Sequence, residues 1–212
     1  DETTDFGMNL RSQWSGVQGA PETQSFIFGT PLGKNVGIGL SVINDKTFIE
    51  NQTAIALDIS YKLKLSESHN LYFGIKGGFT SYDANTDGLL TYGIMQDASL
   101  KNDGLARLGM DKPHMYLVGG YDFNLGSNML LKPSTSIRYV EAAPLSVDIT
   151  GILEFNRKFG LGAGYRLNES ISGLFMFRTN WIDIGYAYEM ALENNISNID
   201  NGTHEILMSL RL

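Results

Sequence analysis

Residues 52–65, QTAIALDISYKLKL, alternate between two kinds of side chain. Ile55 and Leu57 belong to an apolar set at odd positions, and Asp58 and Lys62 belong to a more polar set at even positions. Successive side chains of a β-strand point to opposite faces of a sheet, so this period of two predicts a strand with one apolar and one polar face. Such a strand can face lipid on one side and water on the other.

The same alternation recurs along the chain and predicts about twelve strands of roughly ten residues, the length that a tilted strand needs to cross a bilayer. The clear repeats lie at 145–156, 158–166, 181–190 and 205–212. Weaker repeats lie near 6–14, 22–30, 35–43, 70–80, 115–124, 129–140 and 170–179. We therefore predict an all-β fold, an antiparallel transmembrane β-barrel that occupies residues 1–212 as a single domain.

The connections between these strands are of two lengths. Gly126-Ser127, Asn156-Arg157 and Asn168-Glu169 read as short hairpin turns. Segments 81–113 and 191–202 are longer, polar and rich in Asn, Asp and Gly, so we expect loops there. Short turns that alternate with longer loops are typical of outer-membrane barrels.

Composition excludes several classes of protein. The net charge of −7, without a Lys/Arg cluster, argues against a nucleic-acid partner. The chain has no Cys, which excludes disulfides, zinc–thiolate sites and cysteine catalysis. Only 18% of the residues are charged, which is low for a domain whose whole surface meets water.

A soluble ligand-binding barrel or a sandwich would also alternate, with its apolar face turned inward. Two features favour the membrane barrel. The polar faces carry many Gly, Ser and Ala residues, which suits a crowded lumen. Aromatic residues stand near strand ends on the apolar face, as in an interfacial girdle. They are Tyr61, Phe79, Tyr139, Phe155 and Tyr165.

Several short sequence blocks follow one another in a fixed order over almost the whole chain. Arg11-Ser12-Gln13-Trp14 precedes Gly19-Ala20-Pro21, and the later blocks stand at 31–40, 131–134, 138–139, 142–148, 162–166, 184–189 and 202–206. In this order the blocks resemble the PorP/SprF family of type IX secretion proteins, whose signature joins Arg-x-Gln-Trp to Gly-Ala-Pro. The early Asn-Pro-Ala-Tyr block of that family is missing here, so we expect the N-terminus to be incomplete.

The resemblance implies a barrel in the bacterial outer membrane, within the secretion and gliding apparatus of the Bacteroidota. It also implies binding and anchoring of a secreted adhesin, or of its C-terminal domain, with periplasmic or peptidoglycan-linked secretion components as further partners. The middle of the family contributes additional strands, so we expect about 12–14 strands. A general diffusion porin is the alternative function.

Charged residues on the polar faces would project into the lumen, where opposite charges can stabilise the wall or line a pore. The predicted inward set is Lys62, Lys64, Lys76, Lys132, Arg138, Arg166, Asp58, Asp148, Glu154, Asp183, Glu189 and Glu205. From this set and from the first family block we select the candidate residues for partner or lumen binding. They are Arg11, Gln13, Trp14, Arg138, Arg166 and Glu205.

Metal binding and catalysis have little support. Asp83, Asn85 and Asp87 match the first half of a calcium-binding loop, but its twelfth position holds Ile94 instead of the bidentate Glu. Asx turns explain the same residues without a metal. His204 and Glu205 would point to opposite faces of a strand, and no nucleophile elbow is present. We therefore expect neither a cofactor nor an enzymatic activity.

Overall fold

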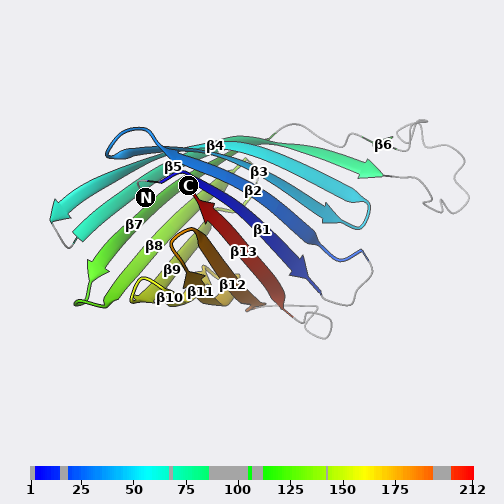
Figure 1. Ribbon diagram of the computed structural model, residues 1–212. Helices are drawn as coiled ribbons and strands as arrows, with labels where there is room; N and C mark the ends of the chain where they lie inside the picture. Colours follow the sequence, from blue (N-terminus) through cyan, green and yellow to red (C-terminus); the bar gives the residue numbers. More distant parts are fainter. Residues whose placement is uncertain are drawn as a thin grey trace, which may run out of the picture.

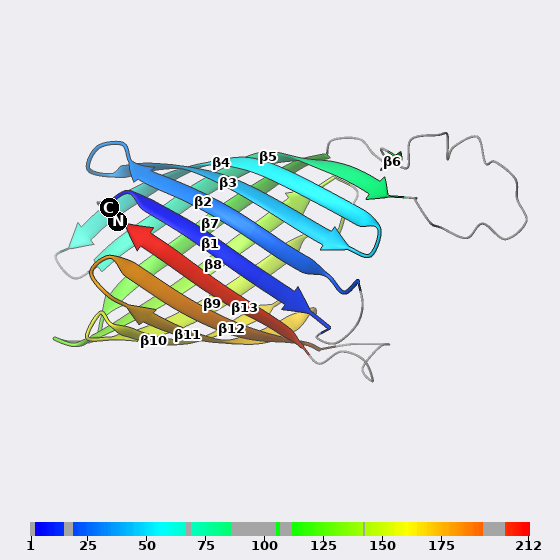
Figure 2. The same cartoon turned by 45° about the vertical axis from the view of Figure 1, so that its right-hand side comes forward.

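The computed structural model describes residues 3–14, 19–66, 69–85, 105–106, 112–141, 143–192 and 202–212. Every regular element in this part of the chain is a β-strand. A search of the same residues finds no helix that is long and apolar enough to span a membrane. The strands form one antiparallel sheet that closes on itself as a barrel (Figure 1, Figure 2).

Twelve strands make up the barrel wall, and the two-residue strand β6 (Leu105–Ala106) is added beside the end of β5. The wall strands are β1 (Asp5–Gln13), β2 (Glu22–Pro31), β3 (Val36–Thr47), β4 (Glu50–Ser66), β5 (His69–Asn85), β7 (Lys112–Asn124), β8 (Met129–Val140), β9 (Ser146–Phe155), β10 (Phe159–Arg166), β11 (Ser170–Arg178), β12 (Ile182–Ala191) and β13 (Thr203–Arg211). Each strand pairs with its neighbours along the chain, and β1 pairs with β13, which closes the wall.

The two chain termini lie at the same end of the barrel (Figure 2). The connections at that end are short, at 32–35, 125–128, 156–158 and 179–181. Asn156 and Arg157 have φ angles of 51° and 55°, as a two-residue turn between twisted strands requires. Outer-membrane barrels have short periplasmic turns, so we call this the periplasmic end and the opposite one the extracellular end.

The structure confirms the predicted strands and places two further strand segments in the region expected to be a loop. Strand β5 continues through residues 81–85, where Glu50 pairs with Ala84, and β6 pairs with the last residues of β5. The total agrees with the expected range of strands.

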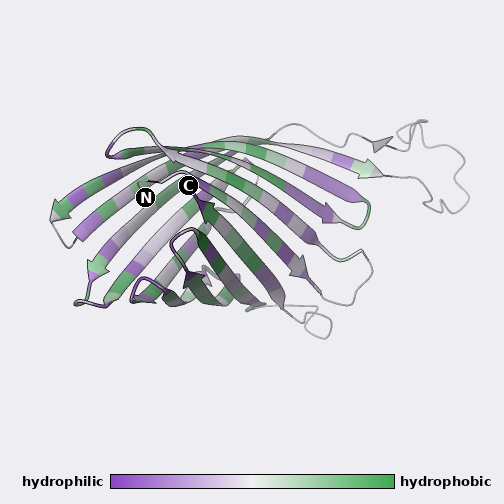
Figure 3. Ribbon diagram, viewed as in Figure 1, coloured by the Kyte–Doolittle hydropathy of each residue, from purple (hydrophilic) through white to green (hydrophobic). Residues whose placement is uncertain are grey.

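The apolar faces of the strands point away from the lumen. Large exposed apolar side chains cover the outside of the wall, and Ala84 is the one buried hydrophobic residue among the described residues. Many inward positions are small or polar, as at Ser41 and Thr80, which are both 1% exposed, and a few are apolar, as at Leu174 and Leu207. Figure 3 shows the resulting alternation along each strand. A soluble barrel would bury its apolar face, so that alternative is wrong.

The residues of the predicted aromatic girdle lie on this outer face, where Phe155 is half-buried and the other four are exposed. Tyr139, Phe155 and Tyr165 lie at or next to strand ends. Tyr61 and Phe79 lie further inside β4 and β5, which extend beyond the ends that the sequence predicts. Trp181, in the turn before β12, is exposed at the periplasmic end. Aromatic rings favour the level of the lipid headgroups, so their positions are consistent with a barrel that spans a bilayer.

Ile75 tests the orientation of the wall, because it is 67% exposed in the middle of β5 on the outer face. We expect Ile75→Arg to destabilise the barrel in liposomes by about 2–4 kcal/mol, the usual effect of a lipid-facing arginine at the membrane midplane. Leu32→Arg, in the turn at the periplasmic end, is the control and should cost about 1 kcal/mol or less. Urea unfolding of both variants measures the difference, and equal values would contradict the orientation.

Candidate functional site

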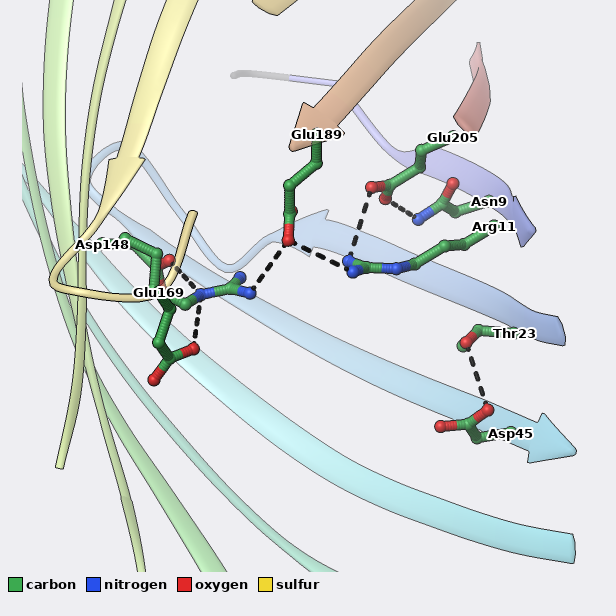
Figure 4. A network of polar contacts seen from close by, with 9 residues as sticks. Asn9, Arg11, Thr23, Asp45, Asp148, Glu169, Glu189 and Glu205 are labelled. Atoms are coloured by element: carbon green, nitrogen blue, oxygen red, sulfur yellow. Dashed lines mark hydrogen bonds and ion pairs between the residues drawn. The ribbon is translucent and has the colours of Figure 1, made fainter. Parts of the chain in front are cut away.

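A group of charged residues lies on the lumen wall in the extracellular half of the barrel (Figure 4). Glu189 of β12 stands between two arginines: its Oε1 is 3.4 Å from Nη2 of Arg11 on β1 and 3.4 Å from Nη1 of Arg166 on β10. Oε2 of Glu205 on β13 is 4.0 Å from Nη1 of Arg11. One carboxylate therefore connects strands β10, β12 and β1 across the closing seam of the barrel.

The same group extends to both sides along the wall. Nε of Arg166 donates to Asp148 Oδ1 at 2.7 Å and lies 3.7 Å from Glu169 Oε2. Asn9 donates a hydrogen bond to Glu205. We call Arg11, Asp148, Arg166, Glu169, Glu189 and Glu205 the extracellular cluster. It holds two arginines against four carboxylates, so this part of the lumen wall is acidic.

A second group, the periplasmic cluster, lies toward the periplasmic ends of β8, β9, β11, β12 and β13. Glu154 Oε2 is 3.3 Å from Lys132 Nζ and 3.1 Å from Arg178 Nη1. Asp183 accepts from Arg178 Nε at 3.0 Å and also pairs with Arg211. The Glu154 side chain is only 5% exposed, so its two cations are its main source of stabilisation.

Uncharged side chains separate the two clusters. Leu174 and Met176 lie on β11 between Ser170 and Arg178, and Ile152 lies on β9 between Asp148 and Glu154. With Leu207 of β13 they line a cavity of about 250 Å³, where Gly160, Gly162 and Gly185 leave room. The lumen wall is thus layered, with an apolar band between two charged ones.

The wall side chains do not fill the lumen. A cavity of about 480 Å³ is lined by Ser60 and Tyr72 from β4 and β5 and by Met176 and Arg178 from β11. Val118 faces inward on β7 and is still 39% exposed. Space therefore remains between opposite parts of the wall.

Another part of the lumen wall, on β4, β5 and β7, carries fewer charges. Lys76 Nζ is 3.2 Å from Asp58 Oδ1 and donates to Ser41 Oγ at 3.1 Å, and it lies 6.0 Å from the centre of the Tyr116 ring. His114 Nε2 and Thr80 Oγ1 are 3.0 Å apart. This surface holds one cation and one carboxylate together with the polar side chains of Ser41, Thr80 and His114.

The six residues predicted to bind a partner or line the lumen lie in three places: the extracellular cluster, strand β8 and the extracellular rim. Arg11, Arg166 and Glu205 come together in the extracellular cluster, and Gln13 accepts from Arg11 Nε at 3.0 Å once its amide is turned. Arg138 lies apart on β8. Trp14 follows β1 at the extracellular end with a φ of 49°. Arg178 and Arg211 were missed, although each occupies an inward position of its strand.

The calcium hypothesis falls partly outside the described residues. Asp83 and Asn85 belong to β5, an extended strand, and Asp87 lies outside the described part of the chain. Within that part, no three His, Asp or Glu side chains are grouped so that they could hold a metal ion. Calcium binding stays a weakly supported alternative, and the expectation that the protein has no cofactor stays a prediction.

The chain matches the family model of the type IX secretion system membrane protein PorP/SprF over residues 1–109 and 89–210. It belongs to the PorP/SprF family. This membership, together with the barrel, places the protein in the bacterial outer membrane as a component of type IX secretion. Partners within the membrane and the secretion machinery follow from the family, and no specific partner does.

Solved structures similar to this PorP/SprF chain are outer-membrane barrels. The KdgM porin aligns with a TM-score of 0.59 at 8% identity, covering 98% of this chain and 99% of the porin. Omp33 of Acinetobacter baumannii aligns with a TM-score of 0.55 at 11% identity, covering 100% and 98%. At such low identity these similarities show the fold alone. No curated protein matches the chain.

Proposed function

We propose that this PorP/SprF protein binds a secreted surface protein, an adhesin or its C-terminal domain, and anchors it at the cell surface. The match to a secretion family over nearly the whole chain carries the proposal. The ion-paired wall supports it, because Glu189 and Glu154 each connect several strands and so stabilise a rigid frame for the extracellular rim. Binding of this kind needs no cofactor and no catalytic step.

Trp14 is the residue of this frame that we expect to contact the partner. It follows β1 at the extracellular end, and tryptophan is enriched among residues that dominate interface energies. The chain contains one other tryptophan, Trp181, which is 74% exposed in a turn at the periplasmic end. The two tryptophans therefore form a matched pair of positions at opposite ends of the barrel.

Purification of the tagged protein from native envelopes in mild detergent, followed by mass spectrometry, tests the proposal. We expect a large surface protein to co-purify, and we expect Trp14→Ala to lower its recovery about tenfold, the effect of removing an interface hot spot. Trp181→Ala should leave the recovery unchanged. Purification of the intact barrel without any surface protein would contradict the anchoring role.

A diffusion porin is the second candidate, and the cavity of about 480 Å³ between opposite parts of the wall favours it. A porin would conduct ions as an isolated protein in a planar bilayer. Conductance with no co-purifying surface protein would replace the anchoring proposal with this one.

A further inference from the structure

Arg138 is the exception among the lumen-facing arginines. In the described part of the chain, Arg11, Arg166, Arg178 and Arg211 each have a carboxylate within 4.0 Å. Arg138 has none there, although it alternates with the outward, exposed Tyr139 and therefore faces the lumen. A guanidinium keeps its charge at any ordinary pH, so this side chain retains unused hydrogen-bond donors.

Ser146, the strand partner of Arg138 on β9, also has an unused polar group. It is 3% exposed, and its Oγ has no hydrogen-bond partner among the described residues. A buried hydroxyl without a partner is costly, and it often marks the place of a water, an ion or a ligand. Arg138 and Ser146 are thus neighbouring lumen-facing residues whose polar groups could both bind a ligand.

The neighbouring cavity has a mixed lining, in which polar side chains stand among apolar ones such as Ile43 and Val118. Its volume is about 250 Å³, and its polar lining is Ser41, Lys76, Thr80, His114, Tyr116 and Ser136. None of its lining residues carries a carboxylate, although Asp58, which lies outside this lining, pairs with Lys76 at 3.2 Å. Tyr116 is the strand partner of both Lys76 and Arg138, and Lys76 Nζ lies 6.0 Å from the centre of its ring. The cavity and Arg138 together form a surface suited to an anion.

The acidic residues of the extracellular cluster cannot easily neutralise Arg138. The strand order runs β1-β13-β12-β11-β10-β9-β8, which places β8 halfway around the twelve-stranded wall from β1. Glu189 on β12 and Glu205 on β13 are four and five strands away from β8, and both already pair with Arg11. Asp148, on β9, is held by Arg166 at 2.7 Å.

We propose that Arg138, Tyr116 and Lys76 form a carboxylate-binding site in the lumen wall. The planar guanidinium of Arg138 would donate two parallel hydrogen bonds to the carboxylate, the Tyr116 hydroxyl would donate a third, and Lys76 would add positive charge. The ligand is an organic acid or an acidic side chain of a polypeptide, which present the same chemical group. This site is independent of the proposed anchoring, because rim binding requires no ligand in the lumen.

Glutarate is the probe, and saturation-transfer NMR on the detergent-solubilised full chain gives its Kd. We expect Arg138→Gln to weaken glutarate binding about tenfold, as for the loss of a charge-assisted hydrogen-bond partner. Arg138→Lys keeps the positive charge but loses the planar pair of donors. Its affinity for glutarate should therefore lie between the affinities of Arg138→Gln and the unmodified protein. Lys132→Gln is the matched control, since it removes a lumen cation of the periplasmic cluster while Arg178 still pairs with Glu154.

Three results would overturn the site: no glutarate binding to the folded protein, equal weakening by Arg138→Gln and Lys132→Gln, or no effect of Arg138→Gln. The shift of the heat-treated band on a denaturing gel verifies that each variant is folded, and Arg138→Lys serves if Arg138→Gln does not fold. An acidic peptide with an amidated C-terminus distinguishes the two sources. Displacement of glutarate supports a polypeptide carboxylate as ligand, and retention supports a free organic acid.

Discussion

Replacing Glu154 with alanine is expected to destabilise the folded barrel by about 3–5 kcal/mol, the usual cost of removing one partner of a buried ion pair. Glu154 is nearly enclosed and forms ion pairs with both Lys132 and Arg178. Its removal leaves two cations close together without the carboxylate between them. Arg178 retains Asp183, but Lys132 has no second carboxylate within 4.0 Å among the described residues.

The measurement is urea unfolding in detergent or liposomes, followed by tryptophan fluorescence. Glu169→Ala is the control, because Glu169 is 49% exposed and its oxygen lies 3.7 Å from Arg166. An exposed pair of this kind contributes about 1 kcal/mol or less. A loss for Glu154→Ala no larger than that for Glu169→Ala would show that the lumen is wet enough to screen the periplasmic cluster.

The fold could be predicted from the sequence because the wall of a membrane barrel is a repeated pattern. The alternation in residues 52–65 determines both the strand β4 and the face that meets lipid, since a strand has a period of two. Hairpin turns such as Asn156-Arg157 mark where strands end. Such local signals are sufficient in this case because nearly every strand pairs with its sequence neighbours.

These local signals did not predict the strand segments at the irregular extracellular end of β5. Residues 81–85 are polar and contain Asp83 and Asn85, which read as loop residues. They form a strand because Glu50–Thr53 of β4 and the short β6 pair with them. Pairing with a distant segment overrides local propensity here, as it often does in sheets.

The candidate site was predicted in part for a related reason. The two-residue alternation correctly indicated that Glu189 and Arg166 face the lumen. It does not indicate which charged side chains form ion pairs with each other. The contact of Glu189 with Arg11 joins residues 178 positions apart and depends on the pairing of β1 with β13. The lack of an ion pair at Arg138 likewise depends on contacts between strands, because Asp148 of the neighbouring β9 pairs with Arg166.

Replacing Gly78 with valine is expected to prevent the barrel from closing between β4 and β5. A Cβ at this position would lie 2.6 Å from Ala56 Cβ and 2.8 Å from Ala56 Cα, and it would also collide with the carbonyl oxygen of Ile55. Two of these atoms belong to the backbone of the paired strand, so no change of rotamer relieves the contact. Overpacking of this kind costs about 3 kcal/mol or more, and a valine adds two methyl groups to the clash.

Gly77 is a control on the same strand. It points to the outer face, and a Cβ there meets no atom within 4 Å. The free energy of unfolding of Gly77→Val should therefore lie within about 0.5 kcal/mol of that of the unmodified protein. The fraction of folded barrel recovered from outer membranes measures both variants. If Gly78→Val is recovered as well as Gly77→Val, β4 and β5 are not held at the spacing of the structure. If only Gly77→Val folds, the inward glycines are required because the strands approach each other so closely, and they cannot be exchanged for larger lumen residues.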